Sequence, residues 1–195
     1  MFAYADINNK ITYNTDLNLL KHVDTSEMVD MSYFCSYRKD LTDELLGDYV
    51  FNVGNSRNLA GAFRRCENKN LTKIAISGGT KNCESMYYCF GFLSSVRVIE
   101  GVISITEKCT NIQYCFYNCQ SLEEVRFDEI CLRSNYLSFA ESKNLSVESM
   151  LSILNALSDN TGLDTTYKVT FGTANLAKLT QEQKEIAYNK NISLA

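Results

Sequence analysis

The hydrophobic pattern of this chain repeats at a nearly fixed interval. Three segments begin with an apolar residue and end in phenylalanine four positions later: Leu59–Phe63, Met86–Phe90 and Ile112–Phe116. The phenylalanines are 27 and 26 residues apart, and weaker copies occur at Met31–Cys35 and Tyr136–Phe139. A chain that is 45% hydrophobic gives some such matches by chance. Agreement at several positions in three copies favours a true repeat.

A strand pattern follows each of the three clear copies. Residues 71–76, 93–98 and 122–127 begin with leucine and continue with alternating apolar and polar positions. This alternation predicts a short half-buried strand, whereas the four-residue step to phenylalanine predicts a single turn or short helix. The side chains expected to point inward are Ile74, Ile76, Val96, Val98, Val125 and Phe127. Those expected to face outward are Lys73, Ala75, Ser77, Ser95, Arg97, Ile99, Glu124, Arg126 and Asp128.

Units of this length cannot bury their apolar faces alone, so they are expected to stack on one another. The spacing predicts an α/β solenoid of about five units of 23–29 residues, with its parallel strands in one sheet and the turns on the opposite side. We expect a single domain over 1–195. It divides into an N-terminal cap at 1–25, repeats at 26–145 and a C-terminal cap at 146–195, and the first 20 residues predict a short strand or hairpin.

The C-terminal cap has its own helix and strand signals. Ser146 can cap a helix that begins at Val147 and stops near Asp159. A strand is expected over 166–171, and Thr180 with Gln183 forms a capping-box pattern that opens a helix to about residue 189. Residues 192–194 predict a last strand. A cap is required because an open solenoid end exposes apolar core and strand edges.

One unit carries a recognisable family pattern. Its spaced apolar and cysteine positions are Phe116, Cys119, Leu122, Val125 and Phe127. This spacing resembles the BspA-type leucine-rich repeat, which reads Phe-x-x-Cys-x-x-Leu-x-x-Val-x-Ile. A second match has two extra residues before its leucine and comprises Phe63, Cys66, Leu71, Ile74 and Ile76.

Other stretches match the family less well. The step from Phe90 to Leu93 is three residues short, which indicates a degenerate unit, and residues 23–34 resemble a related bacterial repeat. The resemblance implies a leucine-rich-repeat fold whose C-terminal helix–strand–helix cap is similar to those of bacterial and phage proteins. It implies no particular activity.

The cysteine and histidine content limits the chemistry that is possible. The chain has eight cysteines but one histidine, His22, and no Cys-x-x-Cys pair. Cysteines on repeat positions are expected to act as small buried hydrophobes, so we expect no metal site and no cofactor. Reduced thiols are expected, with one disulfide between neighbouring units as the alternative in an oxidising setting. Any Ser-His or Cys-His catalytic arrangement would need His22, so we expect a protein that is not an enzyme.

Charge is banded along the chain, which carries a net −4. Residues 1–50, 51–100 and 101–150 have net charges of −5, +4 and −3, and the last 45 residues are neutral. The basic band and the many tyrosines suggest a surface that docks an acidic protein or nucleic acid. Ordinary solubilising charge is the alternative. The candidate partner-binding residues are Arg57, Arg64, Arg65, Lys69, Lys73, Lys81, Arg97, Tyr87, Tyr88, Tyr114, Tyr117, Glu124, Arg126 and Asp128.

These observations favour a non-enzymatic protein-binding module. The specific hypothesis is an intracellular binder or inhibitor of a partner protein, plausibly phage-encoded and directed at a host defence protein in the host cytoplasm. The alternative is a virion or tail component, or a bacterial cell-surface adhesin. The acidic balance makes nucleic acid the less favoured partner. No signal peptide and no apolar run of membrane-spanning length occurs, so no membrane contact is expected; the oligomeric state stays open.

Overall fold

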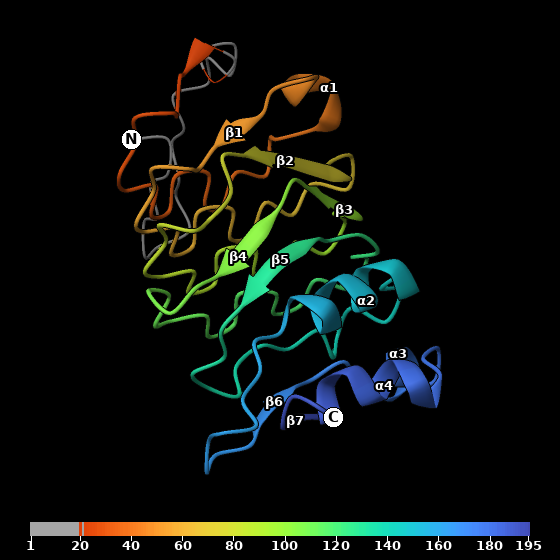
Figure 1. Ribbon diagram of the computed structural model, residues 1–195. Coiled ribbons are helices and arrows are strands. Elements are labelled where there is room, and N and C mark those ends of the chain that lie inside the picture. Colours follow the sequence, from red (N-terminus) through yellow and green to blue (C-terminus); the bar gives the residue numbers. More distant parts are fainter. Residues whose placement is uncertain (1–19, 21) are drawn as a thin grey trace, which may run out of the picture.

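The computed structural model describes residue 20 and residues 22–195. Short parallel strands and a few helices form a mixed α/β structure, in which the elements succeed one another in chain order along the molecule (Figure 1). The strands are β1 (Phe51–Asn52), β2 (Lys73–Ser77), β3 (Val98–Glu100), β4 (Ile103–Ile105), β5 (Phe127–Ile130), β6 (Tyr167–Val169) and β7 (Ile192–Leu194). The helices are α1 (Asp43–Leu46), α2 (Val147–Ala156), α3 (Thr173–Leu176) and α4 (Gln181–Tyr188). The strand or hairpin expected in the first 20 residues lies almost entirely outside the described residues.

The strands form three separate parallel sheets, which corrects the prediction of one continuous sheet. Their orders are β1-β2-β3, β4-β5 and β6-β7. The chain turns at Gly101, where φ is +107° and an added Cβ would collide with the carbonyl oxygen of Ile76. This turn separates β3 from β4, and an isolated parallel bridge joins Val98 of β3 to Glu124, which precedes β5 in the chain. Glycine is needed there because L side chains rarely adopt that backbone conformation.

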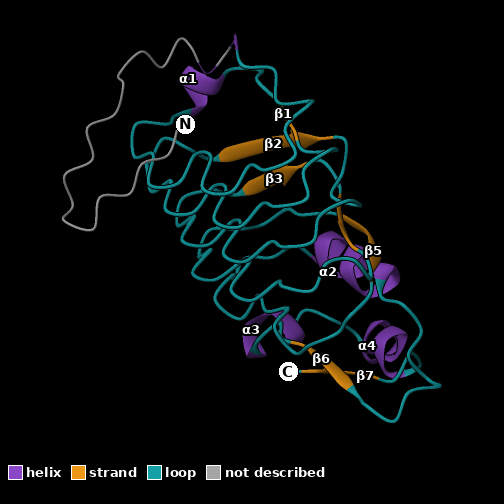
Figure 2. Cartoon of the chain, turned by 90° about the vertical axis from the view of Figure 1, so that its left-hand side faces the viewer, coloured by secondary structure: helices purple, strands orange, loops and turns teal. Residues whose placement is uncertain are grey.

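The segments that end in phenylalanine form consecutive hydrogen-bonded turns and not the short helices that we expected as one possibility. The N–H of Phe63 donates to the carbonyl of Cys89 in the next unit at 2.9 Å. The N–H of Ala62 instead closes a turn onto the carbonyl of Leu59 at 3.0 Å. An α-helix would use its N–H groups along its own axis, whereas these turns leave alternate donors for the neighbouring unit. Figure 2 shows the turns as a column of stacked loops.

Phenylalanine rings at the repeated position stack through the core. The series consists of Phe63, Phe90, Phe116, Phe139 and Phe171, all at most 2% exposed. Successive ring centroids are 5.6, 5.6, 4.7 and 6.0 Å apart. Burial of the repeated phenylalanine is therefore confirmed, including the weak copy that ends at Phe139. Offset aromatic stacking at these separations adds to the hydrophobic gain from burial.

The unit that contains Phe90 is not shortened, which corrects the reading of Leu93 as the strand leucine. Leu93 is 1% exposed and follows Phe90 by three residues, as Cys66 and Cys119 follow their own phenylalanines. Leucine here takes the cysteine position of the repeat. Val96, which is fully buried, then takes the leucine position, because it follows Phe90 by the same six residues that separate Phe116 from Leu122.

This shift changes which strand residues point inward. Ile99 pairs in register with Ile74 and is 2% exposed, whereas Val98 is half-buried, so the inward prediction for Val98 and the outward prediction for Ile99 are wrong. Ala75 is also buried, because it is a short side chain in the middle strand of a three-stranded sheet, and Ser95 is half-buried. The other inward predictions are confirmed by the burial of Ile74, Ile76, Val96, Val125 and Phe127. The outward residues that are exposed are Lys73, Ser77, Arg97, Glu124, Arg126 and Asp128.

The C-terminal elements follow the sequence signals closely. Ser146 caps α2 by accepting from the N–H of Ser149, although the helix ends at Ala156, three residues before the predicted stop. Thr180 and Gln183 make both bonds of the capping box that opens α4. The expected strands appear as β6 and β7, which pair in parallel. The sequence analysis did not predict the short helices α1 and α3.

Candidate functional site

A group of aromatic and arginine side chains gathers at the turns that end in phenylalanine. We call this the turn side of the molecule, and the side that carries β1 to β5 the strand side. We call the group the aromatic–arginine surface, and its members are Tyr37, Arg64, Arg65, Tyr87, Tyr88, Phe92, Tyr114 and Tyr117. Tyr88 lies at its centre: its ring stacks on Tyr114 at 4.7 Å and on Phe92 at 5.8 Å. Tyr114 and Tyr117 are 40% and 41% exposed. The surface is therefore a packed layer of rings that remains open to solvent at one end.

The backbone of the turns holds these rings in place. Tyr88 has φ +53°, Phe92 φ +64° and Tyr114 φ +60°. Left-handed backbone costs an ordinary residue about 1–2 kcal/mol, and glycine or asparagine normally occupies such positions. Bulky residues here point to a role for the side chains, since the backbone alone would favour smaller ones.

Both arginines lie over aromatic faces. The guanidinium carbon of Arg64 is 4.6 Å from the centroid of the Tyr88 ring, and that of Arg65 is 4.3 Å from the centroid of Phe92. The Nε atoms of both arginines are buried without a hydrogen-bond partner, while Arg65 also approaches Glu67 at 3.7 Å. Cation–π contacts of this kind hold the guanidinium in a fixed orientation without neutralising its charge. The surface therefore presents positive charge on a rigid aromatic base.

The basic residues on the strand side are arranged differently. Three of them pair with an acidic residue from a later part of the chain. Lys73 lies 3.1 Å from Glu100, Lys81 lies 3.1 Å from Asp128, and Arg97 binds Glu123 through two contacts of 2.9 and 2.7 Å. The Arg97 contact lowers the pKa of Glu123 and raises that of Arg97. The basic band predicted from the sequence is thus largely neutralised on this side.

The remaining predicted residues lie apart from the rings. Arg57, Lys69, Glu124 and Arg126 are exposed. Glu124 and Arg126 line a hollow of about 620 Å³ beside α2, together with Glu148. Six of the fourteen candidates therefore come together on the turn side, and the others are paired or scattered. The six are Arg64, Arg65, Tyr87, Tyr88, Tyr114 and Tyr117.

Sequence reasoning missed four aromatic residues on the same side. Tyr37 and Phe92 belong to the surface itself, Tyr33 is 45% exposed with its ring against Gly61, and Tyr136 is 53% exposed. For Tyr33 the signal was present in the repeat. Tyr33, Tyr88 and Tyr114 each follow the apolar residue that starts their segment by two positions. Aligning the units on that residue would have identified this column.

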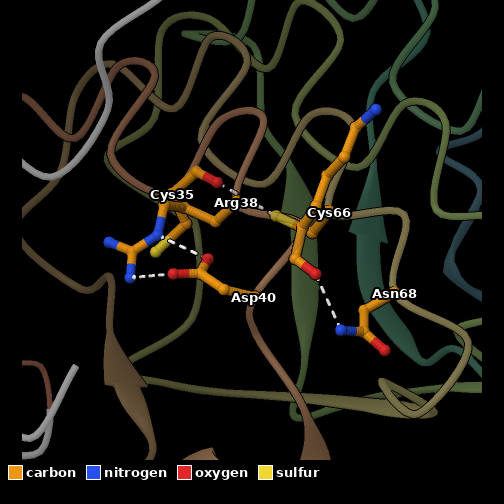
Figure 3. A network of polar contacts seen from close by, with 6 residues as sticks. Cys35, Arg38, Asp40, Cys66 and Asn68 are labelled. Atoms are coloured by element: carbon orange, nitrogen blue, oxygen red, sulfur yellow. Dashed lines mark hydrogen bonds and ion pairs between the residues drawn. The ribbon is translucent and has the colours of Figure 1, made fainter. Parts of the chain in front are cut away.

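An ion pair with a buried arginine lies at the N-terminal end of the described chain (Figure 3). Arg38, whose side chain is 3% exposed, donates to both carboxylate oxygens of Asp40 at 2.8 and 3.0 Å. It takes the position that Cys66 holds in the next unit, where the thiol donates to the carbonyl of Cys35 at 3.0 Å. An ion pair joined by two hydrogen bonds holds its two side chains in a fixed geometry. We assign it a structural role.

The cysteines on repeat positions are core residues, as predicted. All eight are free thiols, and every one except Cys131 is buried. Burial raises the pKa of the Cys35 and Cys119 thiols to about 12, so they are weak nucleophiles. Among the described residues, no group of three or more histidine, cysteine, aspartate or glutamate side chains could hold a metal ion. No helix in the described part of the chain combines the length and apolar character needed to cross a membrane.

The aromatic–arginine surface is the strongest candidate site because it combines exposure, fixed geometry and the positive charge of Arg64, which forms no ion pair with any described residue. Its side chains offer stacking and ion pairing, and they present no nucleophile or general base. Comparison with known proteins adds no family assignment: no protein-family model, no curated protein and no solved structure matches this chain.

Proposed function

We propose that this chain is a leucine-rich-repeat solenoid of about five units that binds a partner protein through the aromatic–arginine surface, and that it is not an enzyme. The stacked phenylalanines and the parallel pairings between successive units support the repeat assignment. The corrected alignment supports it further, since Phe90, Leu93 and Val96 now follow the same spacing as Phe116, Cys119 and Leu122.

One observation carries the binding proposal: Arg64 and Arg65 lie over a continuous layer of rings that is partly exposed. Tyrosine and arginine dominate the residues that contribute most to protein interfaces. Rings already packed against one another lose little conformational freedom on binding, which favours affinity. The partner is expected to place carboxylates opposite the two guanidinium groups, because Arg64 forms no ion pair with any described residue and the Arg65–Glu67 contact is long, at 3.7 Å.

Nucleic acid is the competing partner class, since stacked rings with arginines also suit single strands. The charge distribution argues against it. The chain carries a net −4, and three of its basic side chains are already paired with carboxylates. Binding to phosphates needs several free cations along one track.

The test is affinity capture with wild-type protein and two matched double variants. Arg64→Glu/Arg65→Glu reverses the charge at the surface. Arg57→Glu/Arg126→Glu makes the same change of charge at two exposed arginines for which no ion pair is found among the described residues. We expect wild type and the control variant to retain the same partner from nuclease-treated lysate, and the first variant to lose it while remaining folded by circular dichroism.

Three results would contradict this proposal. A partner lost from both variants would remove the link to the aromatic–arginine surface. A partner lost on nuclease treatment would indicate nucleic acid. Stable incorporation of the protein into virions or cell envelope, with no partner protein captured, would favour the structural or adhesive alternative.

A further inference from the structure

A pocket opens beside the exposed end of the aromatic–arginine surface. It has a volume of about 270 Å³, and its walls include Tyr114, Tyr117 and Tyr136 as well as the carboxylate of Glu141. Two members of the aromatic–arginine surface thus form one side of this pocket, and Tyr136 comes from the following unit. A ligand group in the pocket would lie next to any partner docked on the surface.

The pocket walls are suited to a cation. The rings of Tyr114 and Tyr117 stand nearly perpendicular to each other, at 77° with centroids 5.6 Å apart. Tyr136 is 53% exposed and makes no ring contact within the described part of the chain. The face of an aromatic ring carries negative electrostatic potential, so several tyrosines around one space attract a positive group.

The charge of the pocket points in the same direction. Glu141 is exposed and makes no hydrogen bond or ion pair with any described residue, and no lysine or arginine lines the pocket. The amide oxygens nearby are already engaged: Asn118 accepts from Gln120 at 2.8 Å, and Asn135 accepts from the N–H of Lys168 at 2.8 Å. The carboxylate is the one charged acceptor that lines the pocket.

We propose that this pocket receives an arginine side chain of the docked partner protein, an inference that rests on the proposed docking function. A planar guanidinium can stack on a tyrosine ring and bond to a carboxylate at the same time, which an ammonium does less well. The partner surface would then present carboxylates to Arg64 and Arg65 and an arginine to Glu141. The docking surface is then positive at Arg64 and Arg65 and negative at Glu141. This difference in charge fixes the orientation in which the partner docks.

The test needs no identified partner. The ¹⁵N-labelled full chain is titrated with the peptide Ac-Gly-Arg-Gly-NH₂ and with the matching citrulline peptide, which has the same shape but no charge. Side-chain amide signals of Asn118 and Asn135 report on the pocket, which both residues line. We expect the arginine peptide to shift these signals and to bind at least about fivefold more tightly than the citrulline peptide.

Variants identify the groups responsible. Glu141→Gln should weaken arginine binding about three- to fivefold, and Tyr136→Ala by a similar factor. Glu148→Gln removes an exposed carboxylate that lines the separate hollow beside α2 and serves as the matched control, with affinity unchanged. Equal loss in Glu148→Gln and Glu141→Gln would show a general charge effect and overturn the inference.

Two further probes separate the possible ligands. Choline chloride supplies a free quaternary ammonium, and methyl β-glucoside supplies a neutral sugar that also stacks on rings. Tighter binding of choline than of the arginine peptide, or binding of the glucoside in its place, would overturn the proposal. So would binding of the citrulline peptide at equal strength, or no binding of any probe.

Failure of this inference and failure of the proposed function are distinguishable. If the captured partner depends on Arg64 and Arg65 but the arginine peptide does not bind, only the pocket assignment is wrong. If the peptide binds selectively but no partner protein depends on those arginines, the docking function fails. The pocket would then be a cation site unrelated to docking, which also overturns the inference as stated.

Discussion

The strand side and the turn side of this molecule use charged residues in opposite ways. On the strand side, Lys73, Lys81 and Arg97 form ion pairs with acidic residues of later units. On the turn side, Arg64 and Arg65 lie over aromatic rings, and among the described residues only Arg65 approaches a carboxylate, that of Glu67 at 3.7 Å. Exposed ion pairs contribute little to stability or recognition, whereas desolvated aromatic and arginine groups can contribute much to binding. The position of a basic residue in the repeat therefore matters more than its place in a basic stretch of sequence.

The largest expected effect on stability distinguishes a buried residue of the turn side from an exposed one. Phe116 is 2% exposed in the ring column, whereas its neighbour Tyr117 is 41% exposed. Phe116→Ala should lower the free energy of unfolding by about 3–5 kcal/mol, because it removes a buried aromatic ring. Tyr117→Ala should lower it by less than about 1 kcal/mol. Urea unfolding measures both, and a near-neutral Phe116→Ala would contradict the assigned repeat phase.

The second effect compares an ion pair whose arginine is buried with pairs whose cations are more exposed: the Arg38 side chain is 3% exposed, whereas those of Arg65 and Lys39 are 35% and 67% exposed. Asp40→Asn leaves the buried Arg38 guanidinium without its carboxylate, and we expect a loss of about 2–3 kcal/mol. Glu67→Gln removes the carboxylate that lies 3.7 Å from Arg65 and 4.0 Å from Lys39, and it should cost below about 0.5 kcal/mol. Thermal unfolding of the two variants provides the comparison. Equal losses would show that burial does not set the strength of these pairs.

A third prediction tests whether the rings are held by close packing. A Cβ at Gly91 would lie 2.7 Å from Cδ1 of Tyr88, so Gly91→Ala must move the ring. We expect a destabilisation of about 1 kcal/mol and a changed near-ultraviolet circular dichroism signal from the tyrosines. Gly162→Ala is the control, because nothing lies within 4 Å of the added Cβ. An unchanged tyrosine signal in Gly91→Ala would mean that the ring layer is loosely packed.

The smallest effect concerns pH on the strand side. Burial raises the pKa of Asp128, but hydrogen bonds from Ser104 and Lys81 outweigh it and lower the pKa overall. Such a carboxylate stabilises the fold above its unfolded pKa of about 3.9, and the contribution is lost as pH falls through the folded pKa. Asp128→Asn should therefore reduce the loss of stability on acidification, by less than about 1 kcal/mol. A stronger loss on acidification in the variant would contradict this assignment.

The burial of the spaced phenylalanines and the helix caps at Ser146 and Thr180 could be predicted from sequence because each depends on local spacing. The unit around Phe90 could not be placed correctly, because Leu93 suits either the strand position or the cysteine position. The parallel pairing of β2 with β3 decides between these two positions, because it sets Ile99 beside Ile74. The break between β3 and β4 likewise depends on the close approach of Gly101 to Ile76, which no single-unit pattern reveals.

The candidate site was predictable in part. Tyr88, Tyr114 and the two adjacent arginines were identified from residue type, but residue type did not show that Lys73 and Arg97 would be neutralised by residues 26–27 positions away. Tyr37 was overlooked because its unit is a weak copy of the repeat. Contacts between units, and not composition, determine which charges remain available.

The most direct test of the account is hydroxyl-radical footprinting of the captured complex against the free protein. We predict that oxidation of Tyr114 and Tyr117, which are exposed in the free chain, falls at least about fivefold on binding, as expected for residues at the centre of an interface. Exposed residues of the strand side, such as Arg97 and Arg126, should show no change. Protection of the strand side with the tyrosines unaffected would contradict the central claim that the turn side is the binding surface.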